Sequence, residues 1–238
     1  TYTNVTLAFD AQSKAPLVAY YPDAGSISLH AQYQLPAPPA ATFLTGSSNV
    51  FVVRPFGFAF RGTNAATAIQ HSTSDTGTVL APAGDNFTMT IGAYQWAAGE
   101  DSSPIDGIPD AGVNLSSNGL TPNFAANVTI TVSANLPGIA TGSISRGATC
   151  ASAAVIAAGS FSGGSATVAD WCYSEVGNVL LTATSNDYIT TGTNITGNSG
   201  LDGTGAAGGY VGRFRPKNFA WSGTPTLNNR SPPSGLPG

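Results

Sequence analysis

A short acidic segment at residues 100–112, EDSSPIDGIPDAG, carries the residue types that best fit a metal site. Asp101, Asp106 and Asp110 are spaced along a loop that turns at a glycine, and hard oxygen ligands on such a loop are what Ca²⁺ prefers. The ligand spacing of an acidic calcium loop is only half matched, because Pro104 stands where a side-chain oxygen is needed. Two interpretations stay open: a calcium site, with calcium as the candidate cofactor, or an exposed acidic hairpin loop.

Patterns that would support catalysis are weak. His30 and His71 are the two histidines of the chain, and no G-x-S-x-G nucleophile elbow occurs. The letters GTGAAGG at 203–209 match a phosphate-binding loop, but a strand and not a helix is expected after them. Nothing singles out a nucleophile with its base or two facing carboxylates. The sequence therefore predicts a protein that is not an enzyme.

Three arginines stand out in a chain that has eight Lys and Arg residues in all. Arg54, Arg213 and Arg215 could hold a carboxylate or an acidic sugar through paired hydrogen bonds. Alternatively, they form structural ion pairs with Asp23 or Glu175, since the acidic turn and the arginine strand recur together. The second interpretation is favoured, and the first stays open.

Aromatic rings on the surface could form a platform for stacking a sugar, although single aromatics in strands more often pack in a core. Trp96, next to the acidic loop, is the ligand-contact candidate to test first. The other aromatic residues considered are Tyr20, Tyr94, Trp171, Tyr188, Tyr210 and Trp221.

Composition limits the class of protein. Charged residues make up 8% of the chain, against about 25% in an average soluble domain. The formal net charge of −4 argues against a nucleic-acid partner, which requires a basic surface. No apolar run approaches the roughly 20 residues that span a bilayer, so this segment is not expected to insert into a membrane. Polar but uncharged surfaces of this kind are common on secreted and cell-surface proteins.

The two cysteines, Cys150 and Cys172, are expected to form a disulfide. An exported composition with two cysteines favours this pairing over two buried free thiols. Closing a loop of this size stabilises the fold by about 3 kcal/mol in the chain-entropy model.

Alternation of apolar and polar residues predicts strands. In NFTMTIGAY (86–94), Phe87, Met89 and Ile91 share one face, and NVTITVSA (127–134) alternates in the same way. Glycines and prolines fall mostly between such segments, where turns are expected, and the glycine-rich run 192–209 is expected to be a long mobile loop. The predicted fold class is all-β, with two immunoglobulin-like β-sandwich modules.

One supersecondary plan occurs twice along the chain. YPDAGSISLHA (21–31) aligns with YSEVGNVLLTA (173–183), and FVVRPFGF (51–58) aligns with GRFRPKNF (212–219). Proline cannot donate to a strand ladder, so each Arg-Pro pair is expected at a strand end or on an edge. The repeat predicts a first module at 1–80, a second at 81–222 and a linker-like tail at 223–238. Because the repeat indicates scaffold, function is expected outside it, in the acidic and glycine-rich loops.

Four segments resemble the C-terminal region of the MshQ family of MSHA-type pilus biogenesis proteins, which are bacterial surface proteins of poorly defined activity. They are APLVAYYPDAGSISL (15–29), GSSNVFVVRPFGF (46–58), FSGGSATVADWCYSEVGNVLLTA (161–183) and VGRFRPKNF (211–219), and LTPNF (120–124) belongs to the same pattern. The resemblance implies a surface or pilus-linked protein of a Gram-negative bacterium. It implies no reaction, because the family has no established active site.

Together these features predict a non-enzymatic, exported, extracellular protein: a pilus-associated structural or adhesive component that displays loops on a rigid scaffold. Its expected partners are other pilus or surface subunits or a glycan, and a homo-oligomer is also open. Two alternatives remain. One is a carbohydrate-binding module of a larger secreted protein, and the other is a self-assembling filament subunit in which residues 1–9 add as a strand to a neighbour's edge.

Overall fold

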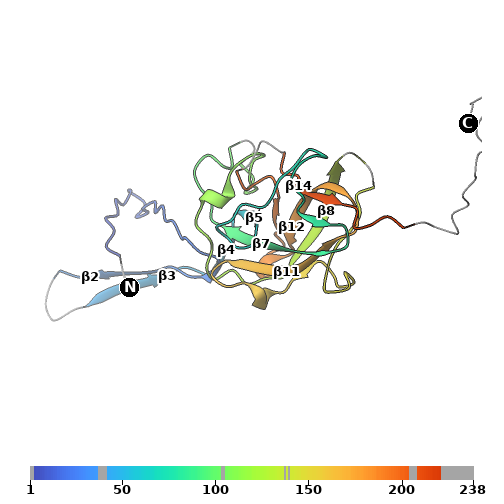
Figure 1. The fold of residues 1–238 in the computed structure, drawn as a ribbon. Coiled ribbons are helices and arrows are strands. Elements are labelled where there is room, and N and C mark those ends of the chain that lie inside the picture. Colours follow the sequence, from blue (N-terminus) through green and yellow to red (C-terminus); the bar gives the residue numbers. More distant parts are fainter. Residues whose placement is uncertain are drawn as a thin grey trace, which may run out of the picture.

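Strands make up the regular structure of this chain (Figure 1). The structure is a computed structural model that describes residues 3–36, 42–102, 105–136, 138, 140–203 and 208–220. The expected tail at 223–238 lies outside these residues. Three short 3₁₀ turns occur in the described part and no α-helix does, so none of its helical segments has the length to cross a membrane. The all-β prediction is confirmed.

The elements follow one another along the chain in this order: β1 (Gly25–Ile27), β2 (His30–Gln34), β3 (Phe43–Ser47), β4 (Phe51–Val53), β5 (Gly57–Arg61), β6 (Ala81–Pro82), β7 (Asn86–Tyr94), η1 (Leu115–Ser117), β8 (Val128–Leu136), β9 (Ile144–Arg146), β10 (Val155–Ile156), η2 (Ala158–Ser160), β11 (Ser165–Tyr173), β12 (Gly177–Ser185), η3 (Tyr188–Thr190), β13 (Ile195–Asn198) and β14 (Val211–Arg215).

Ten of these strands share one hydrogen-bonded network. Its main path runs β10-β8-β12-β13-β5-β7-β11-β9, and β14 joins β12 to β6 beside that path. Most neighbours are antiparallel, whereas β13 with β5 and β14 with β6 are parallel. Two further pairs, β1 with β4 and β2 with β3, complete the strands of this sheet-rich, sandwich-like arrangement.

The core forms where the sequence alternates. Phe87, Met89 and Ile91 of β7 are all buried, as their shared face predicts. Strand β5 is buried on both faces because Phe58 packs in the main core while Ala59 packs in a smaller cluster on the other side. This strand therefore holds the two clusters together, and its removal would open both.

The internal repeat is also a repeat in pairing. In the first copy, Gly25 of β1 lies opposite Val53 of β4. In the second copy, Gly177 of β12 lies opposite Phe214 of β14. Each partner is the residue just before an Arg-Pro pair. β4 ends at Val53 and β14 at Arg215, so each proline lies just beyond the end of its strand, as expected.

The predicted boundary between residues 80 and 81 lies inside the large sheet. Strand β5 precedes this boundary and β7 follows it, yet the two strands pair over the whole length of β5, from Gly57 opposite Tyr94 to Arg61 opposite Thr90. The first half of the chain therefore donates a central strand to the second half. The boundary prediction missed this because β5 lies next to the first Arg-Pro pair, which the repeat assigned to a module end.

The glycine-rich run at 192–209 is not a loop throughout, because residues 195–198 form β13 between β12 and β5. A Cβ atom on Gly197 would lie 2.0 Å from the backbone oxygen of Phe58. Glycine is thus needed here for close approach of two strands rather than for flexibility.

The hairpin of β2 and β3 extends away from the body of the molecule (Figure 1). Every residue of both strands is exposed, including the large apolar side chains of Tyr33 and Leu44. Residues 3–9 run beside it, because two shallow surface hollows are lined jointly by this segment and the hairpin.

The predicted disulfide is present. Cys150 and Cys172 are bonded with their Cα atoms 5.6 Å apart. The bond links the loop after β9 to the end of β11 and so closes a covalent loop within the second half of the chain.

Candidate functional site

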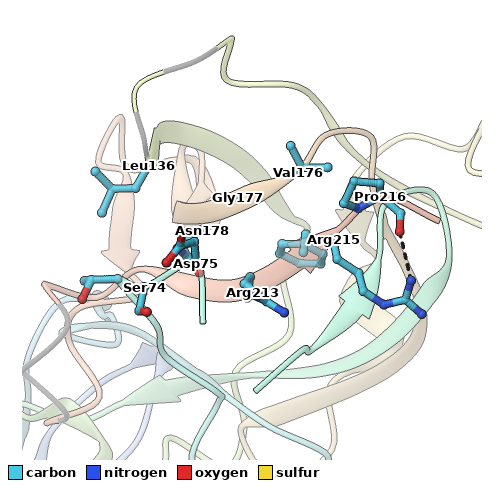
Figure 2. Close-up of a pocket in the computed structure, with 11 residues that line it drawn as sticks. Ser74, Asp75, Leu136, Val176, Gly177, Asn178, Arg213, Arg215 and Pro216 are labelled. Atoms are coloured by element: carbon cyan, nitrogen blue, oxygen red, sulfur yellow. Dashed lines mark hydrogen bonds between the residues drawn. The ribbon is translucent and has the colours of Figure 1, made fainter. Parts of the chain in front are cut away.

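A cavity of about 620 Å³ lies beside the second copy of the repeat. Figure 2 shows its lining side chains gathered around β14 and the start of β12. Four separate segments contribute: the loop between β5 and β6, the end of β8, the turn into β12, and β14 with the proline after it. The lining residues are Thr73, Ser74, Asp75, Leu136, Val176, Gly177, Asn178, Arg213, Phe214, Arg215 and Pro216.

The turn at Gly177 explains why the chain folds this way locally. Gly177 has a φ of +112°, and a Cβ atom there would lie 2.4 Å from both the Asn135 side-chain oxygen and the Leu136 backbone oxygen. Only glycine meets both demands. The tight turn brings β12 close to the end of β8, and this packing sets one wall of the cavity.

Two polar groups at the cavity have buried atoms without a partner. The Nε atom of Arg213 and the Oδ1 atom of Asn178 are buried and make no hydrogen bond with the described residues. Asn178 is only 4% exposed. Buried polar atoms in native structures are nearly always paired, so these two atoms are exceptions among the described residues.

The charged residues of the cavity are two arginines and one acid. Arg215 is exposed and donates from Nη1 to the backbone oxygen of Pro216 at 3.0 Å (Figure 2). Neither Arg213 nor Arg215 takes part in an ion pair within the described residues; those pairs are His71–Asp202, Arg146–Asp170 and Lys217–Asp85. The favoured ion pairing of these arginines with Glu175 is therefore not formed.

The first arginine of the repeat has a different environment. Arg54 donates from Nη2 to the backbone oxygen of Gly107 at 2.6 Å, and Asp23 instead binds Asn123. Burial lowers the pKa of Arg54, while the nearby carboxylates of Asp101 and Asp106 act in the opposite direction. The acidic loop thus covers the arginine of the first copy.

The three carboxylates of the predicted calcium site form hydrogen bonds within their own loop. Asp101 accepts hydrogen bonds from the backbone N–H groups of Asp106 and Gly107, and Asp106 accepts one from Ile108. Asp110 accepts from both the backbone and the hydroxyl of Ser102, and these bonds lower the pKa of its carboxyl. Among the residues that the structure covers, no group of three or more His, Cys, Asp or Glu side chains could hold a metal ion.

The aromatic candidates do not form one surface. Tyr94, Trp171 and Tyr188 are buried in the core, whereas Trp96 is 48% exposed just beyond β7. Trp221 lies outside the described residues. Tyr20 is also exposed, at 63%, and its hydroxyl donates a hydrogen bond to the side chain of Gln95, which precedes Trp96 in the chain.

A buried contact that sequence reasoning missed joins His71 to Asp202. The Nε2 atom of His71 lies 2.8 Å from Asp202 Oδ2, and its Nδ1 atom lies 3.2 Å from the backbone oxygen of Tyr210. Both ring nitrogens are engaged, so neither is available as a general base in this arrangement. The two residues are 131 positions apart, and no local pattern would have paired them.

Comparison with known proteins gives two family models. Residues 54–169 match DUF6701, second domain, and residues 1–47 match the first Ig-like domain of the same domain of unknown function, DUF6701. The junction between the two matches falls at residues 47–54, just before the strand that enters the large sheet. Neither a curated protein nor a solved structure matches the chain.

Proposed function

We propose that this chain, which carries DUF6701 domains, is a non-enzymatic exported protein of the bacterial surface with a structural or adhesive role. The observation that carries the proposal is the Cys150–Cys172 disulfide inside an all-β body. Disulfides form and persist in oxidising, exported environments and are rare in the cytosol. The resemblance to the MSHA-type pilus biogenesis family supports a pilus-linked place for it, with other surface subunits as partners.

The arrangement favours display over catalysis. Both ring nitrogens of the buried His71 are engaged, by Asp202 and by the backbone oxygen of Tyr210. The carboxylates of the calcium candidates form hydrogen bonds within their own loop. What the scaffold presents is the cavity at β14 and the exposed hairpin of β2 and β3. Rigid display of such features is how sheet scaffolds commonly bind partners.

Deleting the part of the gene that encodes this chain tests the proposal. We expect adherence of the bacterium to surfaces to fall, and complementation with the complete gene to restore it. Unchanged adherence together with unchanged surface fibres would remove the structural and adhesive role.

A carbohydrate-binding module is the second candidate, and the exposed ring of Trp96 favours it. A glycan array probed with the purified chain and with Trp96→Ala separates the two. Specific binding that is lost in the variant supports the module, because a single exposed ring then carries the contact. Binding to no glycan removes this candidate.

Strand addition between copies is the third candidate. β2 and β3 pair only with each other in the described part of the chain, so each has an open edge, and open edges pair readily with other chains. Size-exclusion chromatography of a chain that lacks residues 1–12 tests this candidate. Assembly that depends on these residues supports it, and unchanged elution contradicts it.

A further inference from the structure

We infer that the cavity at β12 and β14 binds the C-terminal carboxylate of a peptide from a partner protein. The inference rests on the proposed function for its biological setting, since it names the kind of partner that a surface scaffold would hold. Its chemistry rests on the cavity alone.

The first step is charge. The lining contains Arg213, Arg215 and Asp75, so the two guanidinium groups outnumber the single carboxylate. The arginines have no ion-pair partner within the described residues. Guanidinium groups bind carboxylates through paired, charge-assisted hydrogen bonds, so an anionic carboxylate is the ligand group that this cavity lacks.

The second step comes from the repeat. Arg54 and Arg215 are equivalent positions, since each follows the residue that lies opposite the repeated glycine. Arg54 is taken by the backbone oxygen of Gly107 in an acidic loop of the same chain. Within the described residues no loop from elsewhere in the chain binds Arg215 in this way, and this arginine lines the cavity. At one copy of this arginine the molecule thus already holds a backbone oxygen of an acidic segment.

The third step is the guanidinium groups of the wall. Arg213 and Asn178 both line the cavity, but the Nε atom of Arg213 and the Oδ1 atom of Asn178 are buried below its surface and have no hydrogen-bond partner among the described residues. The carboxylate of a peptide's last residue can instead accept hydrogen bonds from the terminal N–H groups of the Arg213 and Arg215 guanidiniums. Capture of a C-terminal carboxylate by such groups is a known mode of peptide recognition.

The fourth step is the shape of the walls. The apolar lining is aliphatic, from Leu136, Val176 and Pro216. Phe214 also lines the cavity, but it is only 2% exposed, and its ring packs in the core against Phe87 and Tyr173 with ring centroids 5.2 and 4.9 Å apart. Aliphatic walls suit an aliphatic side chain, whereas a sugar ring prefers an aromatic face. A peptide that ends in Leu or a similar residue is therefore favoured over an acidic sugar.

The test is a nuclear magnetic resonance titration of the complete chain with N-acetyl-glycyl-leucine, its C-terminal amide, and glucuronate. We expect the free acid to shift the amide signals of Asn178 and Arg213 with a Kd of about 1 mM or tighter, and the amide to bind at least about tenfold more weakly. Equal binding of acid and amide, preference for glucuronate, shifts confined to another surface, or absence of binding by the acid would each overturn the inference.

Variants locate the contact. Arg213→Gln should weaken binding of the acid by at least about tenfold. Arg215→Gln, at an exposed site on the strand end, should also weaken it, so the test survives if the first variant fails to fold. The matched control is Lys217→Gln, which removes a nearby positive charge whose partner is Asp85 outside the cavity. Lys217→Gln should bind as the native chain does, and an equal loss in all three variants would contradict a site at the cavity.

The outcomes separate the two proposals. If the acid binds as expected but the bacterium adheres normally without the chain, the cavity's chemistry stands and the proposed function falls. If adherence is lost but the acid does not bind, the proposed function stands and this inference falls.

Discussion

Gly177 in β12 lies opposite Phe214 in β14 as Gly25 lies opposite Val53 in the first copy of the repeat. Both glycines have positive φ, +112° and +141°. The copies differ in what surrounds them, because the second is packed against the end of β8 and the first is open. The repeat therefore supplies its own matched controls.

Replacing Gly177 by alanine should be more destabilising than replacing Gly25. A positive φ costs a non-glycine residue about 1–3 kcal/mol at either site. At Gly177 the added Cβ would also meet two oxygens at 2.4 Å, whereas at Gly25 no atom lies within 4 Å. Overpacking of this kind adds about 1–3 kcal/mol. Denaturant unfolding of the two variants measures the difference, and equal losses would show that the close packing at β8 is absent.

Loss of the disulfide should lower stability without changing the fold. Cys150 and Cys172 are separated by 22 positions, and closing a loop of this length stabilises the folded state by about 3 kcal/mol. The double variant Cys150→Ser/Cys172→Ser should therefore melt at a lower temperature than the oxidised chain, and a reducing agent should affect only the native chain. Identical melting of native and variant chains under oxidising conditions would contradict a structural role for the bond.

Alkaline pH should destabilise the fold through Tyr173. Burial, assisted by the charge of Glu175, raises the pKa of Tyr173 from 10.0 to about 12. Because the folded state holds this proton more tightly than the unfolded state, the stabilising contribution is complete below pH 10 and is lost as the pH rises toward 12. Burial also raises the pKa of Tyr94 and Tyr188, which act in the same direction.

Unfolding free energies measured at a series of pH values check this effect. The variant Tyr173→Phe starts from a lower stability, because it loses the hydrogen bond that the hydroxyl donates to Thr141. Its stability should nevertheless fall less steeply above pH 10 than that of the native chain. Parallel curves for the two proteins would show that Tyr173 ionises normally.

The acidic loop should depend on Arg54 for its order. The guanidinium holds the backbone oxygen of Gly107, and no other side chain makes that contact among the described residues. Arg54→Met should speed hydrogen exchange at the amides of Asp106 and Gly107, whereas Arg215→Met, at the equivalent exposed site, should leave them unchanged. Unaltered exchange in Arg54→Met would contradict this anchoring.

Calcium binding by the same loop needs a separate measurement. Because Asp101 and Asp106 already accept hydrogen bonds from the loop's backbone, we expect EDTA to leave the melting temperature unchanged. A ligand that binds only the folded state raises stability by mass action. A rise in melting temperature with added calcium would therefore show that the loop of Asp101, Asp106 and Asp110 binds calcium.

Strand content could be predicted from the sequence wherever one face of a strand is buried. The alternation of Phe87, Met89 and Ile91 gives β7 correctly because each of these side chains enters the core. Strand β13 escaped prediction since its glycine is selected by the close approach of Phe58 and carries no side-chain pattern. The repeat places β5 in the first module, whereas the strand pairs with β7, which lies beyond a long connection.

The candidate site was only half visible in the sequence. Arg213 and Arg215 stand out because arginines are rare here, but their cavity also needs Leu136 and Asp75, which arrive from distant segments. Asn178 directly follows the repeated glycine, Gly177, and this place in the repeat is the signal that could have identified Asn178 as a site residue. The expectation that function lies outside the repeat is not supported by this geometry, because the cavity is built on the second copy itself.

Immunogold electron microscopy of intact bacteria, with antibodies raised against this chain, tests the central claim most directly. An exported structural or adhesive protein predicts gold on the outer surface or on its fibres without permeabilising the cells, and none on a strain that lacks the gene. Labelling that appears only after the cells are opened would contradict it.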